Sequence, residues 1–293
     1  MPKKTKINPG ESVTVTLKKF NMNKIKDNTI IVFIGKRNTG KSVLLLDYLY
    51  HHRQFPVGTV ISPTDNYNHT YRPHVPSIFI HEEYTPELLE QILKRQKDIC
   101  KKCKNKPSYA EVDPKTFVIL DDCLADGNEW VKDKNIKFLF MNGRHVKATF
   151  ILTMQYALGI PPSLRGQIDY VFICKETKAC NLKRLYEHYA SMFPTMDMFK
   201  TVLNKCTNDY GCLVIDNTSN SDKIDEQVYW YRTNINKPDW ETFKMCYNIF
   251  WEGNEKYLAG KDDEKEEKVD FNRLIMKKNQ INFDVKQVGG DNT

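Results

Sequence analysis

Short apolar runs alternate with longer amphipathic stretches from residue 30 to residue 231. The runs are rich in Val, Ile and Phe, and their apolar residues are consecutive rather than alternate. Strands with this pattern are buried on both faces, as in a parallel sheet that helices cover on both sides. The pattern therefore predicts a three-layer α/β fold with a mostly parallel central sheet. The predicted strands are 30–34, 57–61, 77–80, 116–121, 149–154, 170–174, 211–216 and 227–231.

The stretches between these runs predict helices. Residues 42–52 repeat apolar side chains at helical spacing, and residues 86–104 begin with a proline after Thr85, which is typical of a first helical turn. Residues 182–205 predict two helices that break near Pro194.

Composition changes at both ends of the chain, where charged residues replace apolar runs. After Trp251 the chain contains the mixed-charge run KDDEKEEK and ends with the polar sequence GGDNT. We therefore expect a basic N-terminal extension at 1–27, a folded domain at 28–251 with a basic helical insertion at 82–115, and a charged, flexible C-terminal tail at 252–293.

The chain has 293 residues, enough to bury a large core without disulfide bonds. No apolar stretch approaches the roughly 20 residues that cross a bilayer, so no membrane span is predicted. The basic start MPKKTKINPGESV lacks the apolar region of a signal peptide. We expect a reducing compartment and mostly free thiols among the eight cysteines.

The net charge of +7 is concentrated in two segments. Residues 1–26 contain seven Lys and one Glu, and residues 94–106 contain seven Lys or Arg and one Asp. Such clusters attract polyanions, and a solvated helix face is the alternative interpretation.

Residues 35–42, GKRNTGKS, match the Walker A pattern G-x-x-x-x-G-K-[ST] in full. In this pattern the glycines let backbone N–H groups turn toward phosphate oxygens, the lysine reaches the β- and γ-phosphates, and the hydroxyl ligates Mg²⁺. A buried strand precedes the loop and a helix follows it, as the pattern requires. The predicted nucleotide-binding residues are Gly35, Lys36, Arg37, Asn38, Thr39, Gly40, Lys41 and Ser42, with Ser42 also a ligand of Mg²⁺.

The apolar run 116–121 leads into two consecutive acids, as in a Walker B strand. Asp121 is expected to bind Mg²⁺, directly or through water, and Asp122 to orient and deprotonate an attacking water. A turn or a helix cap is the alternative for such a pair. A second acid favours hydrolysis over phosphate transfer, since phosphotransferases must exclude water.

Gln155 ends the next predicted strand, where an amide can contact a γ-phosphate or position water, unless it only faces solvent. The chain order of phosphate loop, acidic strand and polar-ended strand predicts an extra strand between the two Walker strands. This arrangement defines the additional-strand, RecA-like class of P-loop NTPases.

Residues 138–176, FLFMNGRHVKATFILTMQYALGIPPSLRGQIDYVFICKE, resemble the genome-packaging ATPases of nucleocytoplasmic large DNA viruses. These form the poxvirus-type branch of the FtsK/HerA superfamily. The resemblance covers residues 28–232, in which GKRNTGKS, VILDD, NGRH, TMQY, IPPSLRGQIDYVF and VYWYR follow the order found in the family.

The resemblance implies a ring-forming homo-oligomeric motor that hydrolyses ATP with Mg²⁺ and drives double-stranded DNA into a preformed capsid. The implied partners are double-stranded DNA, bound without sequence preference, and proteins of the capsid or its portal vertex. The implied location is the viral factory in the host cytoplasm, or the virion.

Carried over residue by residue, the resemblance assigns metal and water chemistry to Asp121 and Asp122 and the sensor role to Gln155. Arg144, in NGRH, resembles the arginine that superfamily members offer to the ATP of a neighbouring subunit, and Arg165 is the second candidate. A surface ion pair is the alternative for either arginine. Many superfamily members have Glu where this chain has Asp122. The shorter side chain of Asp leaves the role of Asp122 as the base open.

Two other functions stay open at this point: a nucleotide-gated, non-translocating scaffold for virion assembly, and a nucleoside or nucleotide kinase. Cys100 and Cys103 form an isolated C-x-x-C, so a zinc site would need ligands such as Cys123, Cys174 or His81 to approach in space. The motor interpretation favours the basic segment 94–106 as a surface for DNA phosphates, contacted without sequence readout.

Overall fold

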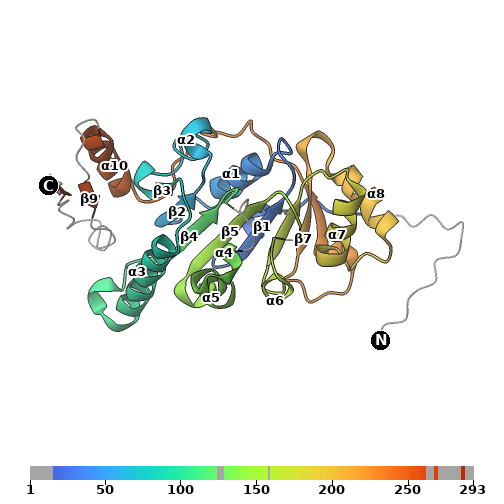
Figure 1. Ribbon diagram of the computed structural model, residues 1–293, viewed down its shortest axis with the longest axis horizontal. Helices are drawn as coiled ribbons and strands as arrows, with labels where there is room; N and C mark the ends of the chain where they lie inside the picture. Colours follow the sequence, from blue (N-terminus) through green and yellow to red (C-terminus); the bar gives the residue numbers. More distant parts are fainter. Residues whose placement is uncertain (1–15, 124–128, 158, 262–266, 270–284, 288–293) are drawn as a thin grey trace, which may run out of the picture.

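The computed structural model describes residues 16–123, 129–157, 159–261, 267–269 and 285–287. Within this part of the chain an eight-stranded sheet forms the centre of the molecule, and helices cover both of its faces (Figure 1). The strand order is β3-β2-β4-β5-β1-β6-β7-β8. The strands are β1 (Ile30–Ile34), β2 (Val57–Ile61), β3 (Ile80–His81), β4 (Thr116–Leu120), β5 (Ala148–Met154), β6 (Tyr170–Ile173), β7 (Cys212–Asp216) and β8 (Val228–Tyr231).

The sheet is mostly parallel, as predicted. The six strands from β3 to β6 in the sheet order pair in parallel, whereas β7 and β8 are antiparallel to their neighbours. One predicted strand is largely wrong: residues Ser77–Phe79 form a 3₁₀ turn, and β3 is only two residues long. Pro76 begins this turn, and its carbonyl accepts the Phe79 N–H at 2.9 Å, which removes that N–H from the sheet.

β5 lies between β1 and β4, so the predicted extra strand between the strand before the phosphate loop and the strand before the acidic pair is confirmed. The register places Ile34 of β1 opposite Met154 of β5, and Leu120 of β4 opposite Leu152. Because these strands are parallel, their carboxyl ends meet at one edge of the sheet. The phosphate loop, the acidic pair and Gln155 all follow that edge.

The longer helices confirm the predictions from periodicity. They are α1 (Lys41–His51), α3 (Pro86–Asn105), α7 (Ala179–Tyr189) and α8 (Met196–Cys206), together with α5 (Lys134–Asn142), which was not predicted. Thr85 and Thr195 cap α3 and α8 by accepting backbone N–H groups at 3.1 and 3.2 Å.

Shorter helical segments complete the described part of the domain. They are η1 (Met22–Lys24), α2 (Asp65–Asn68), η2 (Ser77–Phe79), η3 (Pro107–Tyr109), α4 (Glu129–Lys132), η4 (Gly143–Val146), α6 (Pro162–Arg165), η5 (Asn208–Tyr210) and α9 (Ile224–Gln227).

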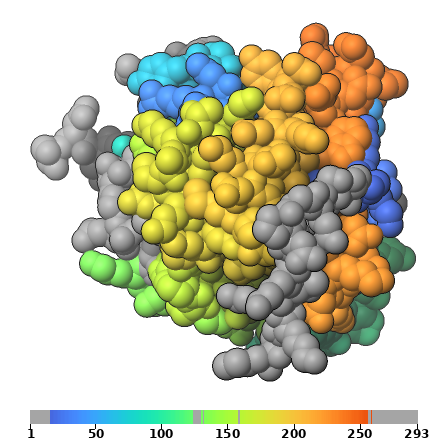
Figure 2. Space-filling model, turned by 90° about the vertical axis from the view of Figure 1, so that its right-hand side faces the viewer, coloured from blue at the N-terminus to red at the C-terminus, as the bar shows by residue number. Residues whose placement is uncertain are grey.

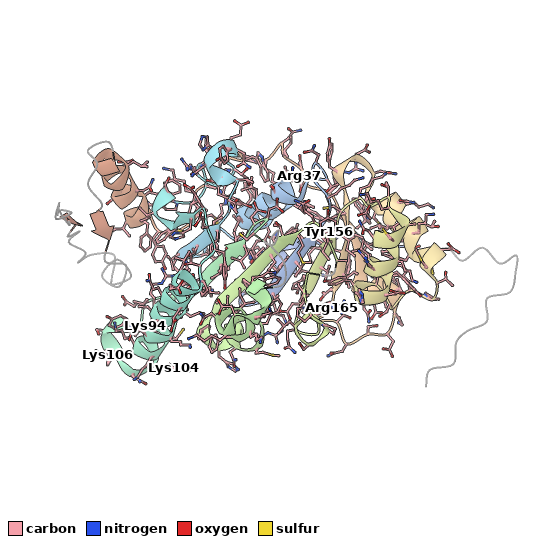
Figure 3. All side chains as sticks on the ribbon, viewed as in Figure 1. Arg37, Lys94, Lys104, Lys106, Tyr156 and Arg165 are labelled. Carbon is pink, nitrogen blue, oxygen red and sulfur yellow. The ribbon has the colours of Figure 1, made fainter. Side chains whose placement is uncertain are left out.

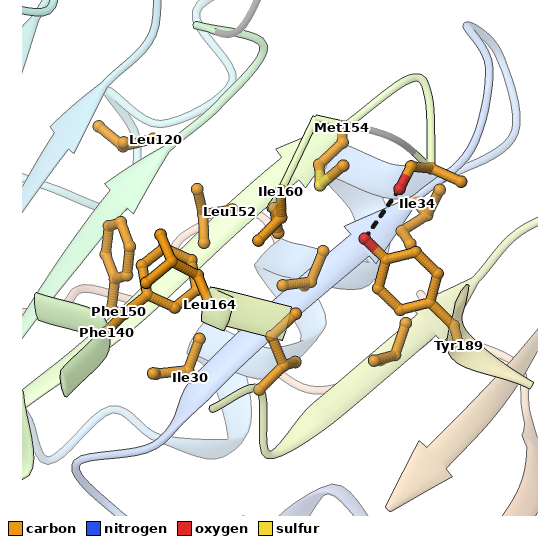
Figure 4. Close-up of a cluster of buried hydrophobic side chains, with 14 of the residues drawn as sticks. Ile30, Ile34, Leu120, Phe140, Phe150, Leu152, Met154, Ile160, Leu164 and Tyr189 are labelled. Atoms are coloured by element: carbon orange, nitrogen blue, oxygen red, sulfur yellow. Dashed lines mark hydrogen bonds between the residues drawn. The ribbon is translucent and has the colours of Figure 1, made fainter. Parts of the chain in front are cut away.

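Two apolar clusters form the layers on either side of the sheet. Ile30, Val32 and Ile34 of β1 face the cluster that contains side chains of α3, α5, α7 and α8. Ile31 and Phe33 face the opposite cluster, which contains the side chains of α1. Figure 4 shows the first cluster, where Phe140 and Leu164 pack over β5, and Figure 2 shows α7 and α8 at the surface of the molecule.

The packed domain extends beyond the boundaries predicted at residues 28 and 251. Phe20, Met22 and Ile25 are buried, and the Phe20 N–H donates to the Trp230 carbonyl at 2.9 Å. At the other end α10 (Asn248–Lys261) crosses residue 251, and its Asn254 accepts the Ile78 N–H at 3.2 Å.

The remainder of the predicted N-terminal extension and tail is only partly described. Residues 1–15, 262–266, 270–284 and 288–293 lie outside the described residues, while β9 (Glu267–Val269) and β10 (Val285–Gln287) pair antiparallel. No helix in the described ranges is long and apolar enough to cross a membrane. All eight cysteines are free thiols.

Gly58 of β2 lets Phe117 of β4 lie against the strand. A Cβ at Gly58 would stand 2.1 Å from atoms of the Phe117 ring, which is fully buried. We expect Gly58→Ala to lower the free energy of unfolding by about 1–3 kcal/mol, because the overpacked ring must move. Urea denaturation measures this. Adding Phe117→Leu should restore part of the loss, and an unchanged midpoint in the single variant would contradict the packing.

Candidate functional site

The phosphate loop connects β1 to α1 at the carboxyl edge of the sheet. Within it the Thr39 hydroxyl donates to the Lys36 carbonyl at 2.7 Å, and Gly40 takes a left-handed conformation with φ of 90°. The Lys41 ammonium donates to the carbonyls of Gly35 and Lys36 at 2.5 and 3.0 Å. The lysine therefore folds over its own loop, next to the positive end of the α1 dipole.

The first glycine of the loop has a packing role as well. A Cβ at Gly35 would stand 2.6 Å from the Cys174 Cβ and 2.7 Å from the Thr39 hydroxyl. The side chains of Lys36, Arg37 and Asn38 are exposed, and Lys36 donates to the Thr177 hydroxyl at 3.3 Å. These three positions, which the motif leaves free, form the outer face of the loop. Figure 3 labels Arg37 in the upper part of the molecule.

Thr153 of β5 holds the two acids in place. Its hydroxyl donates to Asp121 Oδ1 at 2.6 Å and accepts the Asp122 N–H at 2.9 Å. Asp121 is buried, whereas Asp122 is half-buried and has a left-handed φ of 54°. Thr153 was not among the predicted site residues, although a polar residue one position before the end of an apolar strand was a signal that could have indicated it.

Gln155 contacts Asp122 directly. Its side-chain amide donates to both carboxylate oxygens, at 2.8 Å to Oδ1 and 3.0 Å to Oδ2. The residue predicted to sense the nucleotide and the residue predicted to activate water thus form one hydrogen-bonded unit.

Burial dominates the electrostatics of the site. It raises the pKa of Asp121, and the hydrogen bond from Thr153 acts in the opposite direction. Burial also lowers the pKa of Lys41, an effect that the nearby Asp122 and Asp121 carboxylates oppose. Both charges are therefore costly in the folded chain without a ligand to compensate them.

The donor set at this edge suits Mg²⁺. The ion prefers hard oxygen ligands and is usually bound by one or two protein groups together with substrate phosphates. The Ser42 hydroxyl is half-buried at the start of α1, and Asp121 provides a carboxylate at the end of β4. These two groups fit the ligand roles predicted for them.

Arg144 and Arg165 lie near the opposite edge of the sheet. Arg144, in η4, pairs with Asp169, whose other carboxylate oxygen accepts the N–H of Ile30 at the start of β1 at 2.8 Å. The Arg165 guanidinium lies 6.0 Å from the ring centroid of Tyr189, and Figure 3 shows it well below Arg37. The structure thus brings the phosphate loop, Asp121, Asp122 and Gln155 together and separates both arginines from them.

A small cavity behind the loop contains further polar groups that were not predicted. Its volume is about 10 Å³, the space of one water, and Gly35, Gln155, Cys174 and Glu176 are among its lining residues. The Glu176 carboxylate accepts the Thr177 and Lys178 N–H groups at 2.7 and 2.9 Å. Burial raises its pKa, but these hydrogen bonds prevail and the net shift is downward. Glu176 carried no signal in the sequence.

The basic segment forms the outer side of α3. Cys100 is buried against the core, whereas Lys94, Lys101 and Lys104 are exposed. Within the described ranges, no group of three or more His, Cys, Asp or Glu side chains is arranged to hold a metal ion, around Cys100 and Cys103 or elsewhere.

Comparison with known proteins identifies viral relatives. The family model of the poxvirus A32 protein matches residues 17–235. Uncharacterized protein L437 of Acanthamoeba polyphaga mimivirus is 43% identical over 222 residues, which are 75% of this chain and 78% of the relative. Uncharacterized protein 075L of Invertebrate iridescent virus 6 is 34% identical over 256 residues, which are 86% and 94% of the two chains.

Among solved structures, the chain is similar to the genome packaging NTPase B204 from Sulfolobus turreted icosahedral virus 2 in complex with AMPPCP. The TM-score is 0.49 at 15% identity, and the match covers 72% of this chain and all of B204 (100%).

The burial of Asp121 gives a prediction about stability and pH. Because its pKa is raised in the folded chain, wild-type stability falls as pH rises from the unfolded pKa, about 3.9, through the folded one. Asp121→Asn carries no charge, so it should melt about 2–4 °C higher than wild type at neutral pH. The difference should shrink as pH falls below the folded pKa.

Thermal unfolding followed by circular dichroism at neutral and acidic pH measures this difference. Asp122→Asn, at the half-buried neighbouring carboxylate, is the matched control and should shift the midpoint less. A lower melting temperature for Asp121→Asn at neutral pH would show that the carboxylate does not oppose folding.

Proposed function

The chain belongs to the poxvirus A32 protein family, and from this premise we propose that it is an ATP-hydrolysing motor that moves double-stranded viral DNA into a capsid. The observation that carries the proposal is the hydrogen-bonded unit of Asp121, Thr153, Asp122 and Gln155 beside a complete phosphate loop. A nucleotide-binding site alone would need the loop, whereas hydrolysis also needs a positioned acid for water.

In this proposal the phosphate loop binds the phosphates of ATP. Its backbone N–H groups and the Lys41 ammonium bind the phosphates. To do so, Lys41 gives up its hydrogen bonds to the carbonyls of Gly35 and Lys36 and donates to phosphate oxygens instead. Ser42 and Asp121 are the protein ligands of Mg²⁺, which neutralises phosphate charge when it is bound. Ligand binding thus compensates the charges that burial makes costly.

Asp122 and Gln155 control the attacking water. While the Gln155 amide donates to both oxygens of Asp122, it occupies the carboxylate lone pairs that would otherwise accept a proton from water. A γ-phosphate that attracts the Gln155 amide would release Asp122 to accept a proton from water. Gln155 is therefore proposed as the sensor that couples nucleotide binding to the activation of the base.

Hydrolysis gives a direct test of this assignment. Lys41→Ala and Asp122→Asn should each reduce DNA-stimulated ATP hydrolysis to background, because one removes the phosphate contact and the other the base, which alone contributes about 10²–10⁴ in rate. Phosphate release is measured with and without duplex DNA over a range of salt concentrations. Lys200→Ala is the control: this lysine is exposed on α8, away from the phosphate loop, and its variant should keep most of the activity.

Other outcomes distinguish the alternative functions. Hydrolysis that is indifferent to DNA at every salt concentration would contradict a DNA motor. Tight ATP binding with no turnover on DNA would favour a nucleotide-gated scaffold, and transfer of phosphate to a nucleoside or nucleotide would identify a kinase.

We propose that any catalytic role of the two arginines is played in a neighbouring subunit, and the position of Arg144 supports this. Arg144 pairs with Asp169 at the sheet edge opposite the phosphate loop of its own chain. Arg144→Ala and Lys41→Ala should each be inactive, and a loss of about 10³–10⁵ is expected for an arginine finger. Mixing them should restore part of the activity, since about a quarter of the interfaces in a random ring then join an intact loop to an intact arginine.

Arg165→Ala, mixed in the same way with Lys41→Ala, is the parallel experiment for the second candidate. Hydrolysis rates of each variant and of each mixture are the measurement. If neither mixture exceeds the sum of its components, no arginine finger acts from these two positions.

A further inference from the structure

A second cavity lies between α3 and η4, apart from the phosphate loop. Its volume is about 280 Å³, and the side chains that matter here are Cys100, Cys103, Lys104, Arg144, His145 and Lys147. Lys104 comes from the last turn of α3, whereas Arg144, His145 and Lys147 come from η4 and its C-cap. Cations from two separate elements therefore converge on one cavity.

These cations are largely uncompensated. Within the described residues, the ion pair recorded at this cavity is that of Arg144 with Asp169, and the Arg144 side chain is still 63% exposed. A guanidinium has five N–H donors, so it keeps donors for another acceptor. Lys104 and Lys147 are both exposed. A cavity with this charge attracts an anion.

Positive charge continues from the cavity along one side of α3. Lys94, Lys97, Lys101 and Lys104 follow one another at spacings of three and four residues, which places them on one face of the helix. Lys97 lies 4.0 Å from the ring centroid of Phe138 on α5, so this face adjoins α5. Figure 3 shows Lys94 and Lys104 along α3. We call these four residues the lysine stripe.

The acidic residue of this segment does not cancel the stripe. Asp98 pairs with Lys102 at 2.6 Å, one turn further along the helix and off the stripe. The stripe runs over the eleven helical residues from Lys94 to Lys104, a rise of about 15 Å. A small anion would need only the cavity, whereas a stripe of this length suits a polymer with repeated charges. Duplex DNA carries one charge per about 1.7 Å of its axis.

We propose that the cavity binds one phosphodiester group of the DNA backbone and that the lysine stripe binds neighbouring ones. This inference rests on the proposed function, because it assigns the place where the DNA is held. The site lies at the sheet edge opposite the phosphate loop: the Lys147 carbonyl accepts the N–H of Thr116, the first residue of β4, at 3.0 Å. β5 begins directly after Lys147 and ends directly before Gln155, so one strand joins the two sites.

Binding of a fluorescent DNA duplex over a range of salt concentrations tests the proposal. Lys104→Gln/Lys147→Gln should bind about five- to tenfold more weakly near 0.1 M salt, and the slope of log K against log salt should fall by about 1–2. Lys200→Gln/Lys205→Gln is the matched control, because it removes two exposed lysines from α8. It should keep the wild-type affinity and slope, and thermal unfolding checks that both variants are folded.

A second measurement uses the unmodified chain. Cys103 lines the cavity and is half-buried, whereas Cys180 is exposed on α7. Bound DNA should slow the alkylation of Cys103 by iodoacetamide several-fold relative to that of Cys180, as read by mass spectrometry of the peptides.

The outcomes separate this proposal from the proposed function. In one outcome wild type binds DNA, Lys104→Gln/Lys147→Gln keeps the same affinity and salt slope, and Cys103 is not protected. The DNA site then lies elsewhere and the motor proposal stands. If wild type does not bind DNA at any salt concentration, the motor proposal fails, and the proposal that the cavity and the lysine stripe bind DNA fails with it.

Discussion

The hydrogen bonds of the Thr153 hydroxyl are the contact on which the candidate active site depends. One oxygen donates to the Asp121 carboxylate at 2.6 Å and accepts the Asp122 N–H at 2.9 Å, so it fixes two consecutive acids relative to β5. This is possible because β5 lies directly beside β4, with Leu120 opposite Leu152. The same strand ends before Gln155, which holds the Asp122 carboxylate from the other side. The insertion of β5 between β1 and β4 thus determines the geometry of the acids.

This site opposes folding while the rest of the sheet favours it. Asp121 is a buried carboxylate with a raised pKa, and Asp122 occupies a left-handed conformation that is unfavourable for a residue with a Cβ. Around them, the residues of β1, β4 and β5 are buried on both faces of the sheet. A ligand that neutralises Lys41 and Asp121 would therefore stabilise the folded chain by mass action.

The sequence was informative where burial or a local motif determined structure. Strands such as 30–34 and 116–120 could be predicted because both of their faces are buried, and α3 because Thr85 and Pro86 mark its start. The strand at 77–80 was largely wrong because Pro76 begins a turn whose apolar residues are buried without pairing. The contact between Gln155 and Asp122 could not be predicted, since it depends on the left-handed turn at Asp122 and on the register of β4 and β5. A linear motif also does not show at which edge of a sheet an arginine such as Arg144 lies.

The attachment of η4 connects one edge of the sheet to the strands that carry the candidate site at the other edge. η4 continues into β5, and its Arg144 contacts Asp169, which in turn accepts the N–H of Ile30 at the start of β1. η4 is therefore fixed to both strands that carry the candidate site at their other ends: β1 leads to the phosphate loop and β5 to Gln155. Strands in a close-packed core do not stretch or change register at low cost. A displacement of η4 would thus move whole strands rather than single residues. Because Gln155 follows β5 and Asp122 follows β4, a shift of β5 relative to β4 would change the distance between these two side chains.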